Sequence, residues 1–140
     1  MRYKKISKQY FSLEEANGQL TSVKKYILRL MKLNKVIAMV RTLHVQCNDS
    51  FSTEVMFIQQ NKKLHKLYFK FFKTYEDLLN IGATIKDVDQ GLVDFYSVHE
   101  GREILLCYRL GEESITHWHE LHGGYNCRKP VEELQIRRVE

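Results

Sequence analysis

Residues that break helices are scarce in this 140-residue sequence. Proline occurs once, at Pro130, and Gly18 is the only glycine before Gly82. The remaining glycines gather between Gly82 and Gly124. Because helix-breaking residues are confined to the second half of the chain, we predict helices first and turns later.

Cysteine is also scarce, and long apolar runs are absent. Cys47, Cys107 and Cys127 are odd in number, lie far apart and form no CxxC pair, which argues against a disulfide scaffold and against a thiolate zinc knuckle. No apolar run approaches the roughly 20 residues that span a bilayer, and the basic start over 1–8 leads into no apolar signal segment. We therefore expect a soluble, cytoplasmic protein without a membrane partner.

The composition is that of one folded domain with an uneven charge distribution. Apolar residues make up 44% of the chain and charged residues 28%, which is enough to bury a core. Residues 1–80 carry 15 Lys and Arg against 6 Asp and Glu, a net charge of +9, whereas residues 81–140 carry 7 against 11, or −4. The basic half is suited to RNA, DNA or an acidic protein, to a solvated surface, or to the acidic half of another copy.

The first predicted helix begins at a capping box. Ser12 can accept a hydrogen bond from the backbone of Glu15, whose side chain can reach back to Ser12. Apolar residues then recur at spacings of three and four to about residue 46. This pattern predicts one helix over 13–46, with Gly18 as a weak point.

A second helix is predicted after a turn at 47–50. Ser52 or Thr53 can cap its start, the same apolar spacing continues to residue 78, and Gly82 ends it. Two matching apolar stripes joined by a short loop indicate an antiparallel helical hairpin with coiled-coil-like packing. Each stripe contains one asparagine, Asn34 or Asn61, and these either approach each other across the hairpin or lie at solvated points of it.

The second half of the chain alternates between apolar and polar residues, as strands do. Residues 93–98 and 103–110 flank a turn at 99–102, and residues 114–118 can return as a third strand. We therefore predict an α+β fold, with a long antiparallel helical hairpin followed by a small three-stranded antiparallel β-meander. The single domain 1–140 then has three parts, a helical hairpin over 11–82, the β-meander and motif region over 83–130, and a C-terminal tail over 131–140 that is loosely ordered or forms a helical turn.

Several segments together resemble a known family. They are Tyr10–Asn17, Lys86–Phe95, Gly101–Glu103, Cys107–Glu112, Trp118–Glu120, Gly124-Tyr125 and Arg128–Pro130. Their order and spacing resemble the small prokaryotic family catalogued as domain of unknown function 2203 over most of the chain. The resemblance implies no activity, because the family has none to carry over. His117, His122 and Cys127 depart from the family pattern, which weakens any claim that a shared metal chemistry uses them.

A cluster of candidate metal ligands follows the predicted sheet. On a strand, His117 and His119 would point to one face, and a nearby carboxylate or thiolate could complete a tetrahedral zinc site. The candidate ligands are His117, His119, His122 and Cys127. Their spacing matches no known motif such as HExxH, and the competing interpretation is a set of ordinary surface histidines.

A second candidate site uses charged residues near the glycine turns. Asp94, Arg102, Arg109, His119, Glu120 and Arg128 belong to it. If the meander brings them together, they form a pocket able to bind an anion or to support acid–base chemistry. The competing interpretation is a set of salt bridges that hold a small sheet on its helices. Trp118 is expected to anchor the core.

A third feature is a row of lysines on the second helix. Lys62, Lys66, Lys70 and Lys73 lie on one face at helical spacing, where they could neutralise phosphates or simply face solvent. No Gly-rich phosphate loop, GxSxG motif or dinucleotide fingerprint occurs, so whether the protein is an enzyme stays open.

Three functions follow from these features. The first is a cytoplasmic interaction or oligomerisation module, with a homodimer or a protein partner at the helical hairpin. The alternative is a small metal-assisted enzyme or an anion-binding or ligand-binding protein centred on His119 and Glu120. We expect no cofactor, apart from the zinc ion that a metal-assisted enzyme would use. The third is nucleic-acid binding through the lysine row.

Overall fold

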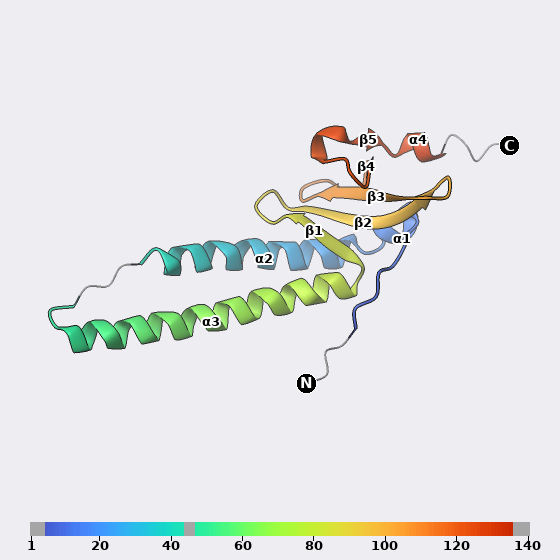
Figure 1. The fold of residues 1–140 in the computed structure, drawn as a ribbon. Coiled ribbons are helices and arrows are strands. Elements are labelled where there is room, and N and C mark those ends of the chain that lie inside the picture. Colours follow the sequence, from blue (N-terminus) through green and yellow to red (C-terminus); the bar gives the residue numbers. More distant parts are fainter. Residues whose placement is uncertain (1–4, 44–46, 136–140) are drawn as a thin grey trace.

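Helices come first in the chain and an antiparallel sheet follows, which confirms the α+β class (Figure 1). The computed structural model describes residues 5–43 and 47–135. Its elements are α1 (Leu13–Asn17), α2 (Leu20–Arg41), α3 (Ser50–Asn80), β1 (Ala83–Asp87), β2 (Leu92–His99), β3 (Arg102–Arg109), β4 (His117–Glu120), the 3₁₀ turn η1 (Tyr125–Cys127), β5 (Lys129–Pro130) and α4 (Glu132–Gln135).

The helical part begins at the predicted capping box. The Ser12 hydroxyl accepts from the Glu15 amide at 3.1 Å, and the Glu15 carboxylate accepts from the Ser12 amide at 3.1 Å. The prediction of one helix over 13–46 is wrong, because α1 stops at Gly18 and α2 starts at Leu20 and ends at Arg41. A glycine in a helix lowers helix stability by about 1 kcal/mol relative to alanine, which makes this a favourable place for a break.

The cap of α3 differs from the prediction, and its end agrees with it. Asp49, rather than Ser52 or Thr53, is the N-cap, and its carboxylate accepts from the Ser52 amide at 2.8 Å. Gly82 follows the last turn with φ of 94°, a left-handed conformation that glycine adopts without steric cost. A Cβ at Gly82 would overlap the ring of Phe11, so this turn also needs glycine for space.

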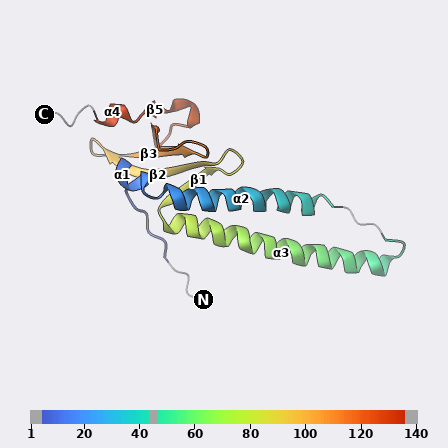
Figure 2. The same ribbon diagram turned by 180° about the vertical axis from the view of Figure 1, so that it is seen from behind.

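Helices α2 and α3 lie side by side and antiparallel, as both views show (Figures 1 and 2). The Gln60 side chain joins them by donating to the carbonyl oxygens of Val40 and Leu43 at 2.6 and 3.0 Å. The buried residues of α3 are Thr74 and Leu78, which lie in its last turns beside the sheet. We call the pair of helices α2 (Leu20–Arg41) and α3 (Ser50–Asn80) the helical arm.

The two asparagines of the apolar stripes bond elsewhere, so they form no polar pair across the arm. The Asn34 amide donates to Asp89 Oδ1 in the β1–β2 turn at 3.1 Å. The Asn61 amide donates to the carbonyl oxygen of Phe57 in its own helix at 2.8 Å. The first asparagine therefore connects α2 to the sheet, and the second stays within its own helix.

The sheet has five strands in the order β1-β2-β3-β4-β5, and neighbouring strands pair antiparallel. The prediction of a three-stranded meander is therefore wrong. It identified β2 and β3, misplaced the third strand by a few residues, and missed β1 and β5 at the edges. Strand β5 has only two residues, and its pairing depends on the tertiary position of the chain, which local sequence patterns do not record.

The two faces of the sheet have different coverings. The face with Val93, Phe95, Leu106 and Trp118 packs on the helices in one apolar core, as predicted for Trp118. The turn after β4 approaches the opposite face, where Gly123 lies close to His119, whereas Val131 and Leu134 return to the apolar core. Helix α4 provides the helical turn anticipated for the tail, whereas residues 136–140 lie outside the described residues.

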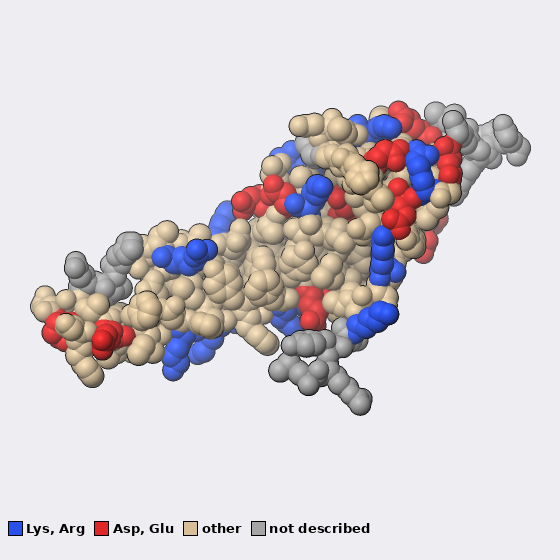
Figure 3. Space-filling model, viewed as in Figure 1, with Lys and Arg blue, Asp and Glu red and all other residues tan. Residues whose placement is uncertain are grey.

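The helices of the described residues include none that is long and apolar enough to cross a membrane. Uncharged side chains cover most of the face of the arm turned to the viewer in Figure 3, and charged side chains gather around the sheet. On this face the arm and the sheet therefore differ in charge.

Candidate functional site

The turn between β2 and β3 sets the first two residues of the site opposite each other. Counting five residues outward from the turn pair His99 and Arg102 reaches Asp94 on β2 and Cys107 on β3, and these two are Cα partners. Directly opposite residues in an antiparallel pair share a face of the sheet and have Cβ atoms about 4.5–5.5 Å apart. Their face is the one turned away from the helices.

Strand β4 adds His119 to the same face. Its Cα partner is Leu105, and Cys107 is paired with His117, so His119 and Cys107 are diagonal neighbours across β3 and β4. One ligand atom from each of Asp94, Cys107 and His119 lies within 4.8 Å of the other two. The three residues are 3%, 2% and 1% exposed. Three groups able to carry charge thus meet in the interior.

Both ring nitrogens of His119 have a partner. Nδ1 lies 2.8 Å from the carbonyl oxygen of Glu120, and Nε2 lies 3.3 Å from Asp94 Oδ1. A carbonyl oxygen only accepts, so Nδ1 carries a hydrogen and Nε2 faces the carboxylate. The hydrogen bonds to Asp94 and then to Cys107 raise the pKa of His119 from 6.5 to about 10, although burial opposes this.

The chain after β4 covers the cluster. A Cβ at Gly123 would lie 3.5 Å from the Cβ of His119 and 3.2 Å from the Cβ of Cys127. The turn at 121–124 therefore approaches His119 closely, and its glycine leaves room for this packing. A surface hollow of about 930 Å³ lies elsewhere, between Phe11, Leu13, His99 and Leu134, and its lining does not include the cluster.

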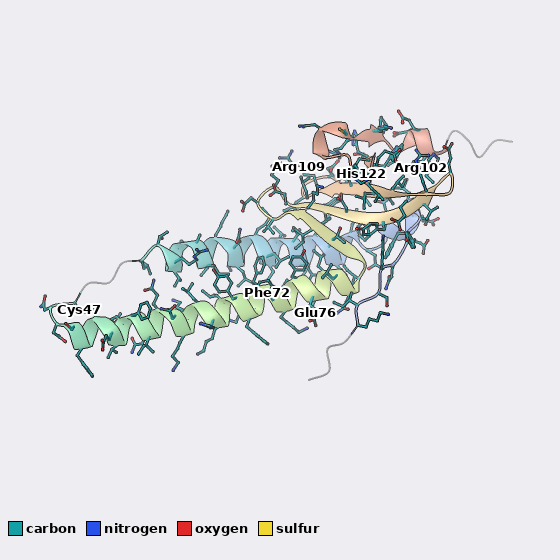
Figure 4. The ribbon with its side chains drawn as sticks, viewed as in Figure 1. Cys47, Phe72, Glu76, Arg102, Arg109 and His122 are labelled. Carbon is teal, nitrogen blue, oxygen red and sulfur yellow. The ribbon has the colours of Figure 1, made fainter. Side chains whose placement is uncertain are left out.

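Arg102 and Glu120 form a separate ion pair. Arg102 donates from Nε and Nη2 to the Glu120 carboxylate at 2.7 to 3.2 Å, and from Nη1 to Glu100 at 3.1 Å. The Arg102 hydrogen bonds lower the pKa of Glu120. Their side chains are 44% and 39% exposed, so water screens the pair. Figure 4 places Arg102 and Arg109 at opposite ends of β3.

Arg128 belongs to a third polar group. Its Nη2 donates to both carboxylate oxygens of Glu112 at 3.2 and 3.3 Å and lies 3.1 Å from Nδ1 of His117. The backbone amide of Arg109 donates to the same carboxylate at 2.7 Å. This group holds the turn after β3 against the segment before β5, which is the role of a structural ion pair.

The six predicted residues of the anion site thus divide among three places. Asp94 and His119 come together, and Arg102 pairs with Glu120. Arg128 joins Glu112, whose carboxylate also accepts from the backbone amide of Arg109. In the predicted metal set, His122 and Cys127 are exposed, and the Nδ1 of His117 is held by Thr116 and Arg128. Among the described residues, Asp94, Cys107 and His119 bring three possible metal-ligand atoms together. His119 is the one of these three that belongs to both the predicted metal set and the predicted anion site.

Sequence reasoning missed Cys107 as a site residue. The signal was available, because the predicted turn at 99–102 already fixes the register that sets Cys107 opposite Asp94. Cysteine is often buried as a small apolar residue, so Cys107 was interpreted as an apolar strand residue and not as a candidate ligand.

The lysine row of the third prediction lies on α3. Lys62, Lys66, Lys70 and Lys73 are all exposed. Lys73 forms an ion pair with Asp77 one turn later, at 2.8 Å. The row is thus open to solvent, with one of its charges partly balanced within the helix.

Comparison with known proteins gives one match. The family model described as Uncharacterized conserved protein (DUF2203) matches residues 9–131. No curated protein and no solved structure matches the chain. The matched segment contains every element from α1 to β5 and all three residues of the buried cluster.

Proposed function

Because the chain belongs to the DUF2203 family of uncharacterised conserved proteins, whose description assigns no activity, we propose a function from geometry: an interaction module that pairs with a second copy through its helical arm. We place this assembly in the cytoplasm, since Cys47, Cys107 and Cys127 are free thiols.

The observation that carries the proposal is the exposure of large apolar side chains along the arm. Phe57 and Phe72 of α3 are 65% and 63% exposed, and Tyr68 between them is partly exposed. At 100° per residue these three lie within about 60° of one another around the helix. We call them the aromatic face. Water-exposed aromatic residues aligned along a helix are typical of an interaction surface.

The charge pattern supports pairing through this face. The lysine row lies roughly 150° around α3 from the aromatic face, by the same helical geometry. Two arms can therefore meet through Phe57, Tyr68 and Phe72 while their lysines stay in water. Figure 4 labels Phe72 on α3, two residues before the buried Thr74.

The size of the arm also suits a second copy. Helix α3 has 31 residues, and at 1.5 Å per residue it is about 46 Å long. A surface about 40 Å long and two helices wide offers on the order of 800 Å² per partner, which is the usual half of a stable interface. Two antiparallel arms would then form a four-helix bundle, in which the helices of each copy cover the exposed apolar side chains of the other.

Light scattering after size-exclusion chromatography tests the proposal over a range of protein concentrations. We expect a dimer for the natural chain and a monomer for the Phe57→Ser, Phe72→Ser double variant. Serine and phenylalanine have similar helix propensities, so the helix itself should survive. Val98→Ser is the matched control, because Val98 is also exposed, at 56%, but lies on β2. A natural chain that stays monomeric, or a dimer that the double variant retains, would refute the proposal.

Nucleic-acid binding is the second candidate, and it depends on the lysine row. The same preparations separate it from self-association. A binding shift with RNA or DNA that weakens with salt, persists in the Phe57→Ser, Phe72→Ser variant and vanishes in Lys62→Glu, Lys66→Glu would favour it over the arm dimer.

A further inference from the structure

We propose that Asp94, Cys107 and His119 bind a zinc ion. This site lies on the sheet face turned away from the helices, and it stands or falls independently of the helical arm. It differs from the histidine-rich set predicted from sequence, with which it shares only His119.

The separation of the donor atoms fits a tetrahedral ion. Zinc bonds of about 2.0 to 2.1 Å to nitrogen and oxygen place two such ligands about 3.3 Å apart. Nε2 of His119 and Oδ1 of Asp94 lie 3.3 Å apart. Because all three ligand atoms lie within 4.8 Å of one another, small side-chain rotations bring Cys107 to its bonding distance as well.

The ring of His119 is oriented as a zinc ligand would be. Histidines that bind metal usually donate their second ring N–H to a carbonyl or carboxylate, which fixes the tautomer and turns the other nitrogen toward the metal. Nδ1 of His119 lies 2.8 Å from the carbonyl oxygen of Glu120. Nε2 faces Asp94, so a zinc ion there would replace the Nε2 proton and bind the lone pair that this leaves.

The donor set favours zinc over the other common divalent ions. A thiolate and an imidazole are ligands that zinc prefers, whereas magnesium and calcium prefer oxygen. The carboxylate of Asp94 and the thiolate of Cys107 together carry two negative charges, which balance Zn²⁺. This balance matters because all three residues are buried, where an unbalanced charge is costly.

The fourth coordination position falls to water. His117 lies on the same face and is paired with Cys107, but its Nδ1 is held by Thr116 at 2.8 Å and Arg128 at 3.1 Å. Three protein ligands with one position for water is the arrangement of zinc sites that activate water or bind a small anion.

Metal titration of the full chain tests the proposal after treatment with a chelator. We expect Zn²⁺ to bind with one ion per chain in calorimetry and elemental analysis, and Mg²⁺ not to compete. Co²⁺ should bind in its place and give the absorption of a tetrahedral ion with a sulfur-to-metal charge-transfer band. Cys107→Ser should abolish that band and weaken Zn²⁺ binding by more than about 100-fold, since even outer partners of a metal ligand contribute 10-fold to 100-fold.

Two exposed residues provide matched controls. Cys127→Ser and His122→Ala remove a thiol and an imidazole from the same end of the chain and should leave binding unchanged. Circular dichroism of each variant checks that the fold is retained, and His119→Gln offers a second test of the site if Cys107→Ser unfolds. Zinc bound below one ion per chain, a cobalt complex without the sulfur band, or loss of binding in either control would overturn the proposal.

Discussion

Replacing Asp94 by asparagine in the metal-free protein tests the buried pair of Asp94 and His119. The change keeps the shape of the side chain and removes its charge. The pKa of His119 is raised from 6.5 to about 10, chiefly by the Asp94 hydrogen bond, so the native state holds a proton that the unfolded chain releases above pH 6.5. This stabilisation is complete below pH 6.5 and is lost as the pH rises toward 10.

The size of the effect follows from burial. Asp94 and His119 have side chains that are 4% and 1% exposed, and removal of one partner from a buried ion pair costs about 3–5 kcal/mol. Between pH 6.5 and 10 one proton changes the free energy of unfolding by about 1.4 kcal/mol per pH unit. The Asp94→Asn variant should therefore be about 3–5 kcal/mol less stable than the natural chain at pH 6, and the difference should become much smaller by pH 9.

Urea unfolding at pH 6 and pH 9, with chelator present and at one protein concentration, measures both quantities. Asp77→Asn makes the same chemical change in the exposed ion pair with Lys73, where we expect less than about 1 kcal/mol and little change between the two pH values. The reasoning fails if the loss in Asp94→Asn at pH 6 equals that of the control. It also fails if the loss is the same at pH 9 as at pH 6.

Three further predictions concern the fold and are measured by urea unfolding. Gly82→Ala should lower the free energy of unfolding by about 2–4 kcal/mol, because alanine would be strained at this positive φ and its Cβ would overlap Phe11. Gly111→Ala is the control, since Gly111 has φ of 106° but open space around it, and this variant should lose only the part due to strain. Equal losses in the two variants would contradict the overlap with Phe11. Ser12→Ala should cost about 1 kcal/mol by removing the cap of α1, and no loss would mean that the box is not stabilising. Arg102→Ala should cost less than about 1 kcal/mol, and a larger loss would contradict the surface character of its ion pair.

Features with local causes were predictable from the sequence. The Ser12–Glu15 box and the stop at Gly82 depend on residues close in the chain, and both formed as expected. The α1–α2 break was harder to predict, because Gly18 weakens a helix without deciding that it ends. Strand β5 was not predictable at all, since its two residues pair only where the chain after β4 folds back.

The candidate site was predictable in part for a related reason. Asp94 and His119 were singled out as polar groups near turns, and they meet because the register of three strands brings them together. Arg102 and Arg128 had the same appearance in sequence, yet they lie at other places and pair with Glu120 and Glu112. Charged residue types identify candidates, whereas strand register decides which of them share a site.

The burial pattern of α3 has a consequence for how the molecule opens. Thr74 and Leu78 hold the last turns of the helix against the core, whereas residues 50–60 include no buried side chain. Local opening costs least where apolar contacts are few. Amide hydrogens near Phe51 should therefore exchange with solvent orders of magnitude faster than those near Leu78. The N-terminal end of α3 would then open while its C-terminal end stays folded.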